Sequence, residues 1–159
     1  MHQPPDSEEE LLEKHRRSLP HWNFPDSIYF VTWRLHKNQK KMEPDERAFI
    51  CETLKHFDLK RYQLFSFVVM DDHVHVLFRP MTGQWLSKIL HSWKSFTANR
   101  LQRDFKRRGS IWQEESYDRI VRNEREFYSE VRYILNNPNK RWQVEEYPWM
   151  FWRPPEESP

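Results

Sequence analysis

The chain has 159 residues, with 26 Lys and Arg against 24 Asp and Glu, eleven Pro, two Gly and one Cys. This length is typical of a single domain, and an aromatic content of 16% supplies enough apolar side chains for a core. One cysteine excludes an intramolecular disulfide and a zinc ribbon. No apolar run is long enough to span a membrane, and residues 1–17 lack the basic and then apolar order of a signal peptide, so we expect a cytoplasmic protein without membrane contact.

The charges are distributed unevenly along the chain, although they almost cancel at a net +2. Five acids lie between Asp6 and Glu13, and the last six residues are all Pro, Glu or Ser. We therefore expect a polar tail over residues 1–22, one folded domain over 23–142, and a C-terminal tail rich in Pro, Trp and Glu over 143–159.

The first half of the folded domain contains three predicted strands and one helix. Residues 27–35 are rich in β-branched and aromatic side chains and predict the first strand. Apolar residues then recur at three and four positions, which predicts a helix that begins just after Pro44. The runs 61–70 and 73–79 predict two further strands, joined as a hairpin at the acidic pair 71–72.

The second half contains a long helix, a short strand and a final helix. The apolar spacing from Leu86 onward predicts a helix that stops near Gly109, and residues 116–121 predict a fourth strand. Asn123, followed three residues later by a glutamate, resembles a capping box, and Pro138 is expected to end the helix that starts there. The element order predicts an α+β fold, a ferredoxin-like split βαβ sandwich with helices on one side of an antiparallel sheet and an appended C-terminal helix.

Two histidines stand out in the third predicted strand. His73 and His75 are two positions apart, so both imidazoles project from the same face of the sheet. Neighbouring neutral imidazoles can bind one metal ion, but the same pattern also occurs as a hydrogen-bonded pair on a half-buried sheet. The spacing by itself leaves both interpretations open.

The last predicted helix carries a second polar pair. Tyr133 and Asn137 lie one turn apart on a flank beside the apolar stripe, so both side chains can contact the same ligand or neighbouring residue. In a split βαβ plan a terminal helix can cross the sheet face that bears the histidines. We then expect His73, His75 and the Asn137 amide oxygen to hold a cation next to the Tyr133 hydroxyl. Mixed nitrogen and oxygen ligands suit Mg²⁺ or Mn²⁺ bound at a phosphate, and a cation favours the phenolate form of a tyrosine nucleophile.

Five segments in the same order are similar to a known family: "FPDSIYFVTWRL", "VVMDDHVHVLFRP", "LSKILHSWKSFTANRLQR", "IWQEESYDRIVRNEREF" and "VRYILNNPNKRW". They span about Phe24 to Trp142, and the sequence resembles the single-tyrosine HUH transposases, more closely their REP-associated tyrosine transposase branch. The resemblance implies a ferredoxin-like domain, usually dimeric, that cleaves and joins single-stranded DNA beside imperfect hairpins. The segment "NNPNKRW" departs from the Pro-Val-Arg-Ala-Gly-like continuation that is frequent in the family.

The resemblance also assigns roles to matching residues of this chain. It implies that His73 and His75 are the metal pair, that Asn137 is the third ligand of Mg²⁺ or Mn²⁺, and that Tyr133 is the nucleophile. The expected activity is strand transfer or nicking through a 5′-phosphotyrosine intermediate. The expected partners are single-stranded or hairpin DNA and a second copy of the chain.

A basic segment is the candidate DNA-binding surface. Seven Lys or Arg and one acid lie between Gln84 and Gly109, a pattern that is also typical of a solvated helix face. The resemblance favours neutralisation of DNA phosphates by these side chains as a set. Its members are Lys94, Arg100, Arg103, Lys106, Arg107 and Arg108, with Arg119 and Arg122 as weaker candidates.

Two alternative functions are compatible with the same residues. A catalytically silent relative would bind hairpin DNA with a steep salt dependence and would not nick it. A small hydrolase would hold Zn²⁺ through His73 and His75 and activate water, but the chain shows no clear third His, Cys or acid at ligand spacing. His36, His56 and His91 also have no partner at that spacing.

Overall fold

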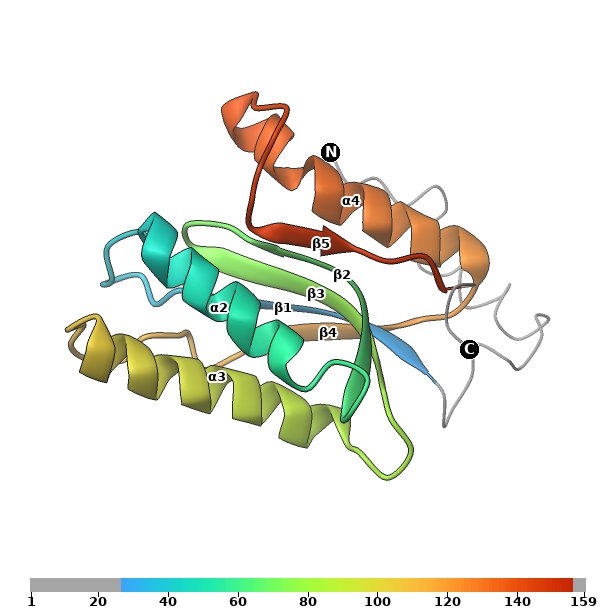
Figure 1. The fold of residues 1–159 in the computed structure, drawn as a ribbon, viewed down its shortest axis with the longest axis horizontal. Coiled ribbons are helices and arrows are strands. Elements are labelled where there is room, and N and C mark those ends of the chain that lie inside the picture. Colours follow the sequence, from blue (N-terminus) through green and yellow to red (C-terminus); the bar gives the residue numbers. More distant parts are fainter. Residues whose placement is uncertain (1–26, 156–159) are drawn as a thin grey trace.

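The computed structural model describes residues 27–155, so the predicted polar tail over 1–22 lies outside the described residues. Within the described residues eight elements follow one another (Figure 1): β1 (Ile28–Arg34), α2 (Pro44–His56), β2 (Tyr62–Val69), β3 (His73–Pro80), α3 (Leu86–Asp104), β4 (Tyr117–Val121), α4 (Glu124–Trp142) and β5 (Met150–Trp152). All four predicted strands and all three predicted helices are present. The strand β5 is an addition to the predicted set.

The strands form one antiparallel sheet in the order β4-β1-β3-β2-β5. The first four strands therefore have the order expected of a split βαβ plan, and the predicted α+β ferredoxin-like class is confirmed. β5 adds an edge strand beside β2, where Phe67 pairs with Phe151.

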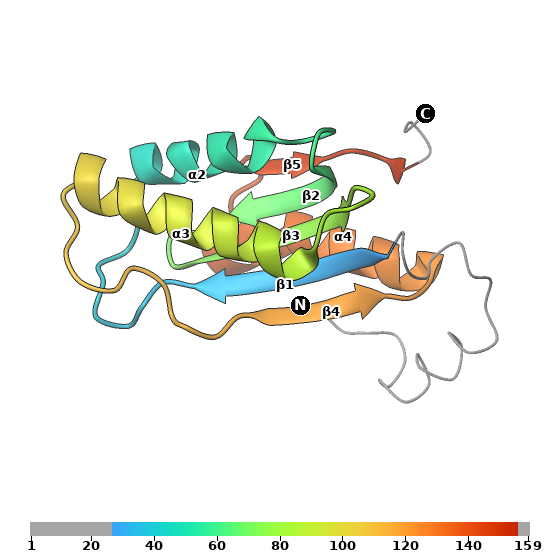
Figure 2. The same ribbon diagram turned by 90° about the horizontal axis from the view of Figure 1, so that it is seen from below.

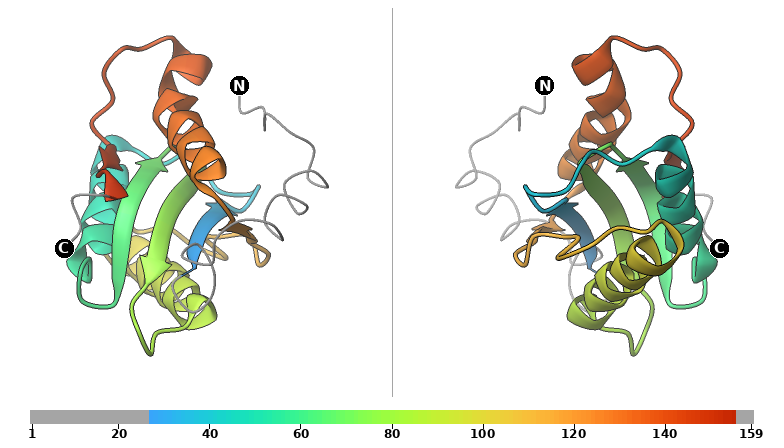
Figure 3. Two further views of the ribbon diagram at one scale, coloured as in Figure 1. Left: turned by 90° about the vertical axis from the view of Figure 1, so that its right-hand side faces the viewer. Right: turned by 90° about the vertical axis from the view of Figure 1, so that its left-hand side faces the viewer.

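Two helices cover one face of the sheet and the third covers the other. α2 and α3 lie together across one face (Figure 2), and α4 lies on the opposite side (Figure 3). The core beneath α2 and α3 includes Trp33, Ile50, Leu54, Trp93 and Leu101. The core beneath α4 includes Phe30, Phe65, Phe127, Val131 and Ile134.

The central strand β3 divides its side chains between these two cores. Val74 and Val76 belong to the core beneath α2 and α3, whereas Leu77 belongs to the core beneath α4. Because successive strand residues point to opposite faces, His73 and His75 share the α4 side with Leu77. The two-residue period of β3 thus places both imidazoles beneath α4, as the sequence predicted.

The final helix begins as predicted and ends later than predicted. Asn123 caps it, with its side-chain oxygen accepting from the Glu126 backbone N–H at 2.8 Å. Pro138 does not end the helix, which continues to Trp142 and closes at Gln143 with a left-handed φ of 57°. A proline removes one intrahelical hydrogen bond, but here its side chain is buried and the following turn is tied to the sheet, so the helix persists.

The predicted C-terminal tail contributes to the sheet through β5. Arg153, just after this strand, is anchored by an ion pair to Asp58, with Nη2 2.6 Å from Oδ2. The sequence signal missed β5 because three residues are too few to show a two-residue period. Within residues 27–155, no helix has the length and hydropathy needed to cross a bilayer.

Candidate active site

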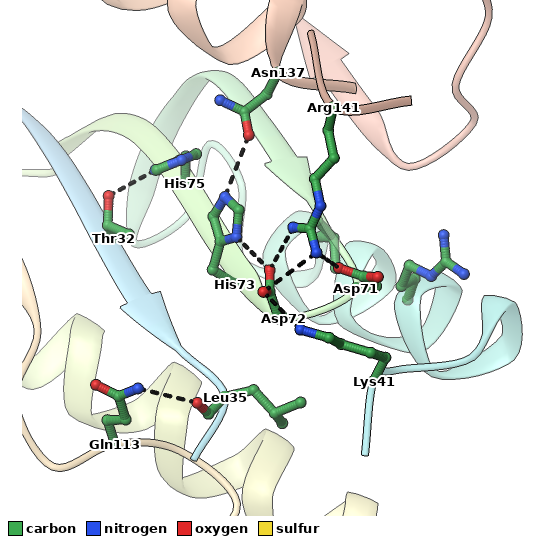
Figure 4. A network of polar contacts seen from close by, with 12 residues as sticks. Thr32, Leu35, Lys41, Asp71, Asp72, His73, His75, Gln113, Asn137 and Arg141 are labelled. Atoms are coloured by element: carbon green, nitrogen blue, oxygen red, sulfur yellow. Dashed lines mark hydrogen bonds and ion pairs between the residues drawn. The ribbon is translucent and has the colours of Figure 1, made fainter. Parts of the chain in front are cut away.

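The two histidines of β3 lie side by side under α4 (Figure 4). Their ring centroids are 4.6 Å apart, and the residues are 7% and 2% exposed for His73 and His75. Both rings are therefore mostly withdrawn from solvent, between the neighbouring strands and α4.

His73 is held between a carboxylate and an amide. Its Nδ1 lies 2.7 Å from Asp72 Oδ1. An ionised carboxylate can only accept, so the His73 Nδ1–H donates to Asp72. Nε2 lies 3.2 Å from Asn137 Oδ1, and the Asn137 Nδ2 donates to the Tyr133 carbonyl oxygen at 3.4 Å. The amide is thus turned with its oxygen toward the imidazole.

His75 is oriented by β1. Its Nδ1 lies 2.6 Å from the Thr32 hydroxyl, and its ring stacks on Phe30 with centroids 5.4 Å apart. Thr32 and His75 face each other across the β1–β3 ladder, so strand register brings the hydroxyl to the ring. Thr32 was not a candidate in the sequence, because its role depends on a register that the sequence does not state.

Tyr133 reaches the same place from α4. Its ring lies edge-on to His75 with centroids 5.1 Å apart, and edge-on to Phe30 at 6.0 Å. The structure therefore brings together the four residues that the sequence singled out, two imidazoles from β3 and a phenol and an amide from α4.

The converging atoms fit a divalent cation. The Nε2 atom of His73 and the carbonyl oxygen of Asn137 are 3.2 Å apart, and neighbouring ligands around an octahedral Mg²⁺ with bonds of about 2.1 Å lie about 3 Å apart. Hydrogen bonds at the opposite ring nitrogens, to Asp72 and Thr32, are the contacts that orient metal-binding imidazoles. Among the described residues no three His, Cys, Asp or Glu gather as a ligand group, and the further oxygen found beside His73 is that of the Asn137 amide.

Asp72 joins the histidine pair to α4 and to the loop after β1. Besides His73, its carboxylate receives Arg141 Nη1 at 2.9 Å and Lys41 Nζ at 3.0 Å. The hydrogen bond from His73 and then those from Arg141 and Lys41 hold the pKa of Asp72 well below its usual range, although burial opposes them. Asp72 and Arg141 were missed in the sequence, and the only available signal was the position of Asp72 next to His73.

Arg107 does not belong to a DNA-binding surface. Its side chain is 2% exposed and forms an ion pair with Glu46, with Nη2 2.8 Å from Oε1. The same guanidinium donates to the carbonyl oxygens of Lys40 and Lys41 at 2.8 and 3.1 Å. This burial corrects the expectation that Arg107 contacts DNA. A basic run in the sequence does not reveal that one of its members points inward and pairs with an acid on α2.

Three more members of the basic set are engaged by the protein itself, and one of them, Arg103, pairs through Nε with Asp104 Oδ1 at 3.0 Å. Lys94 Nζ donates to the carbonyl oxygens of Gln113 and Glu114 at 2.9 and 3.1 Å, and burial lowers its pKa. Arg100 is paired with Asp104 and lies over the rings of Phe49 and Phe96 beside a hollow of about 450 Å³ between α2 and α3. The weaker candidate Arg119 pairs with Glu126 at 2.8 Å.

Three members of the basic set remain exposed, namely Arg103, Lys106 and Arg108. α3 lies on the sheet face opposite the histidines, so the helix itself does not line the candidate site (Figure 3). The segment after α3 nevertheless contacts the loop after β1, because Gln39 Nε2 donates to the Arg108 carbonyl oxygen at 2.6 Å. The same loop contributes Lys41, which pairs with Asp72 beside the histidines.

Comparison with known proteins adds a family and a fold. Residues 27–137 match the family model described as "Transposase IS200 like". The fold is similar to that of the REP-associated tyrosine transposase bound to a REP hairpin, with a TM-score of 0.64 and 17% identity over 84% of this chain and 81% of that chain. It is also similar to a putative transposase from Deinococcus radiodurans R1, with a TM-score of 0.51 and 18% identity over 75% and 96% of the two chains. No curated protein sequence matches the chain.

Proposed function

This chain belongs to the family of IS200-like transposases, and from that premise we propose that it cleaves and rejoins single-stranded or hairpin DNA with Tyr133 as the nucleophile. The observation that carries the proposal is the contact between the Tyr133 ring and His75, with centroids 5.1 Å apart. A phenol from α4 and two oriented imidazoles from β3 are the groups that such a reaction needs in one place.

The bond changes follow from the chemistry of a phenol. The Tyr133 Oη attacks a DNA phosphorus, a bond forms between Oη and phosphorus, and the bond from phosphorus to the 3′ oxygen breaks. The phenol gives up one proton to solvent and the departing 3′ oxygen takes up one from solvent, so a 3′-hydroxyl is released and a 5′-phosphotyrosine remains. Reversal of the attack by a 3′-hydroxyl rejoins a strand without an external energy source.

His73, His75 and Asn137 would hold the Mg²⁺ or Mn²⁺ ion. Such an ion polarises the phosphodiester and stabilises the phenolate. The other residues of this site then act by holding the ligands in position. Asp72 and Thr32 fix the two rings, and Asn137 is held by its hydrogen bond to the Tyr133 carbonyl oxygen.

DNA contact is proposed for the exposed cations that follow or end α3. Arg103, Lys106 and Arg108 supply charge near the loop that carries Lys41, and a phosphate backbone is the ligand that such a group attracts. The solved transposase with a similar fold was bound to a REP hairpin, which supports a hairpin as the first DNA to test here. A homodimer is part of the same proposal and is tested by light scattering.

A covalent-adduct experiment tests the nucleophile. Wild-type protein incubated with Mn²⁺ and a hairpin oligonucleotide that has a 5′ single-stranded extension should give a protein–DNA adduct that survives denaturing electrophoresis. Tyr133→Phe should abolish the adduct and leave the dissociation constant for DNA nearly unchanged, and EDTA should abolish it as well. Tyr128→Phe, on the same helix, is the matched control and should form adduct like wild type. An equal adduct yield from Tyr133→Phe would refute the assignment.

A further inference from the structure

Arg141 binds both acidic residues of the turn that precedes His73. Its Nη2 lies 3.0 Å from Asp71 Oδ1, and its Nη1 lies 2.9 Å from Asp72 Oδ1 (Figure 4). The guanidinium is one-third exposed, and its planar fork suits two carboxylates at once. This pairing ties the last turn of α4 to the β2–β3 connection.

The same helix makes a second contact next to this turn, from Asn137 to His73. Asn137 is one turn before Arg141 on α4, so the two side chains share a face. Asn137 Oδ1 lies 3.2 Å from His73 Nε2, and His73 Nδ1 lies 2.7 Å from Asp72 Oδ1. Arg141 Nη1 donates to the same Asp72 oxygen, so the contacts lead from α4 through His73 and Asp72 back to α4. The position of α4 and the orientation of the His73 ring are therefore set by one closed ring of contacts.

Arg141 exists in this position because α4 continues through Pro138. A helix that stopped at the proline would carry Tyr133 and Asn137 but not Arg141. The extra turn lies in the segment "NNPNKRW", and α4 ends at Trp142. The extra turn thus supplies the cation that pairs with Asp71 and Asp72.

We propose that Arg141 is a positioning residue that acts through Asp72, holding the His73 ring and the tyrosine-bearing helix in register with each other. The inference rests on the proposed function only where it concerns the effect of Arg141 on DNA cleavage. The effect of Arg141 on the orientation of the His73 ring can be measured in the protein without DNA or metal.

Four proteins test this role: wild type, Arg141→Ala, Arg141→Lys and Lys140→Ala. The Lys140 variant removes the same charge from the neighbouring exposed position and is the matched control. Two-bond ¹H–¹⁵N spectra of ¹⁵N-histidine protein without metal should show His73 with its proton on Nδ1 in wild type and Lys140→Ala. Arg141→Ala should give a mixture of ring tautomers. Arg141→Lys keeps one contact and should fall between them.

Metal and DNA measurements complete the test. Arg141→Ala should weaken Mn²⁺ binding about 10–100-fold and slow adduct formation by a similar factor, because orienting contacts of this kind have effects of that size. The dissociation constant for the hairpin oligonucleotide should change less than about twofold.

The opposing results are separable. Unchanged His73 resonances and Mn²⁺ affinity in Arg141→Ala would overturn the positioning role. Loss of DNA binding in proportion to adduct formation, with the ring unaffected, would make Arg141 a DNA contact instead. Failure of wild type to form any adduct would refute the proposed function, while the tautomer and Mn²⁺ measurements would still decide the role of Arg141.

Discussion

Tyr133 packs edge-on against His75, with ring centroids 5.1 Å apart and an interplanar angle of 61°. The two residues come from the last helix and from the central strand, so they meet only because α4 crosses the face of the sheet opposite α2 and α3 (Figure 3). Phe30 contacts both rings, at 5.4 Å from His75 and 6.0 Å from Tyr133. A small aromatic cluster therefore fixes the phenol beside the imidazole.

Removal of the Thr32 hydroxyl should loosen the His75 ring without changing the core. Thr32→Val keeps the shape of the side chain and removes the 2.6 Å contact to Nδ1. We expect Mn²⁺ affinity, measured by isothermal titration calorimetry, to fall about 10–100-fold. Thr32→Ser retains the hydroxyl and should bind Mn²⁺ nearly as wild type does. Equal affinities for all three proteins would mean that this contact does not orient a ligand.

Substitution of Arg107 should lower the free energy of unfolding and should not remove a direct contact with DNA. Arg107→Met leaves Glu46 as a buried, unpaired carboxylate, and breaking one partner of a buried ion pair costs about 3–5 kcal/mol. Urea denaturation should show this decrease in the free energy of unfolding. The exposed neighbour Arg108 is the matched position, and Arg108→Ala should change stability by less than about 0.5 kcal/mol. Similar effects at both positions would contradict the buried pair.

The Glu46–Arg107 pair should also make stability depend on acid pH. Burial would raise the pKa of Glu46, but the hydrogen bond from Arg107 and the Glu43 backbone N–H lower it below its ordinary 4.5. A group of this kind stabilises the folded state above its unfolded-state pKa, and that contribution is lost as the pH falls through the folded-state pKa. The free energy of unfolding should therefore decline below pH 4.5. Glu46→Gln should show a shallower decline in denaturation curves from pH 7 to pH 3, and an identical decline would exclude Glu46 as a source.

Exposed cations after α3 should determine part of the salt dependence of DNA binding. Neutralising Arg103, Lys106 and Arg108 to Gln should weaken binding to all single strands in a similar way. Each lost phosphate contact lowers the slope of log K against log salt by about 0.7, so three contacts would lower it by about 2. Fluorescence anisotropy across a salt series measures the slope. An unchanged slope would place the DNA on another surface.

Much of the fold follows from local patterns that the sequence states directly. The period of β3 put His73 and His75 on one face and Val74 on the other, and the structure agrees because strand side chains alternate. The spacing on α4 placed Tyr133 and Asn137 on one flank for the same kind of reason, since residues four apart on a helix are neighbours.

The parts that the sequence missed depend on contacts between distant segments. Pro138 has the local signature of a helix end. The helix nevertheless continues to Trp142, and Arg141 in this last turn is stabilised by ion pairs with Asp71 and Asp72. Arg107 has the signature of a basic surface, and its burial depends on Glu46 in α2. Neither outcome can be read from neighbouring residues.

The sequence by itself determined the types of all the described elements except β5, the shared face of the two histidines and the shared flank of Tyr133 and Asn137, because these depend on periods of two and four along the chain. Only the tertiary structure decided which groups orient those residues. Thr32 meets His75 through strand register, and Arg141 meets Asp72 through the docking of α4. Such contacts are fixed by the packing of whole elements, and a one-dimensional pattern does not contain that information.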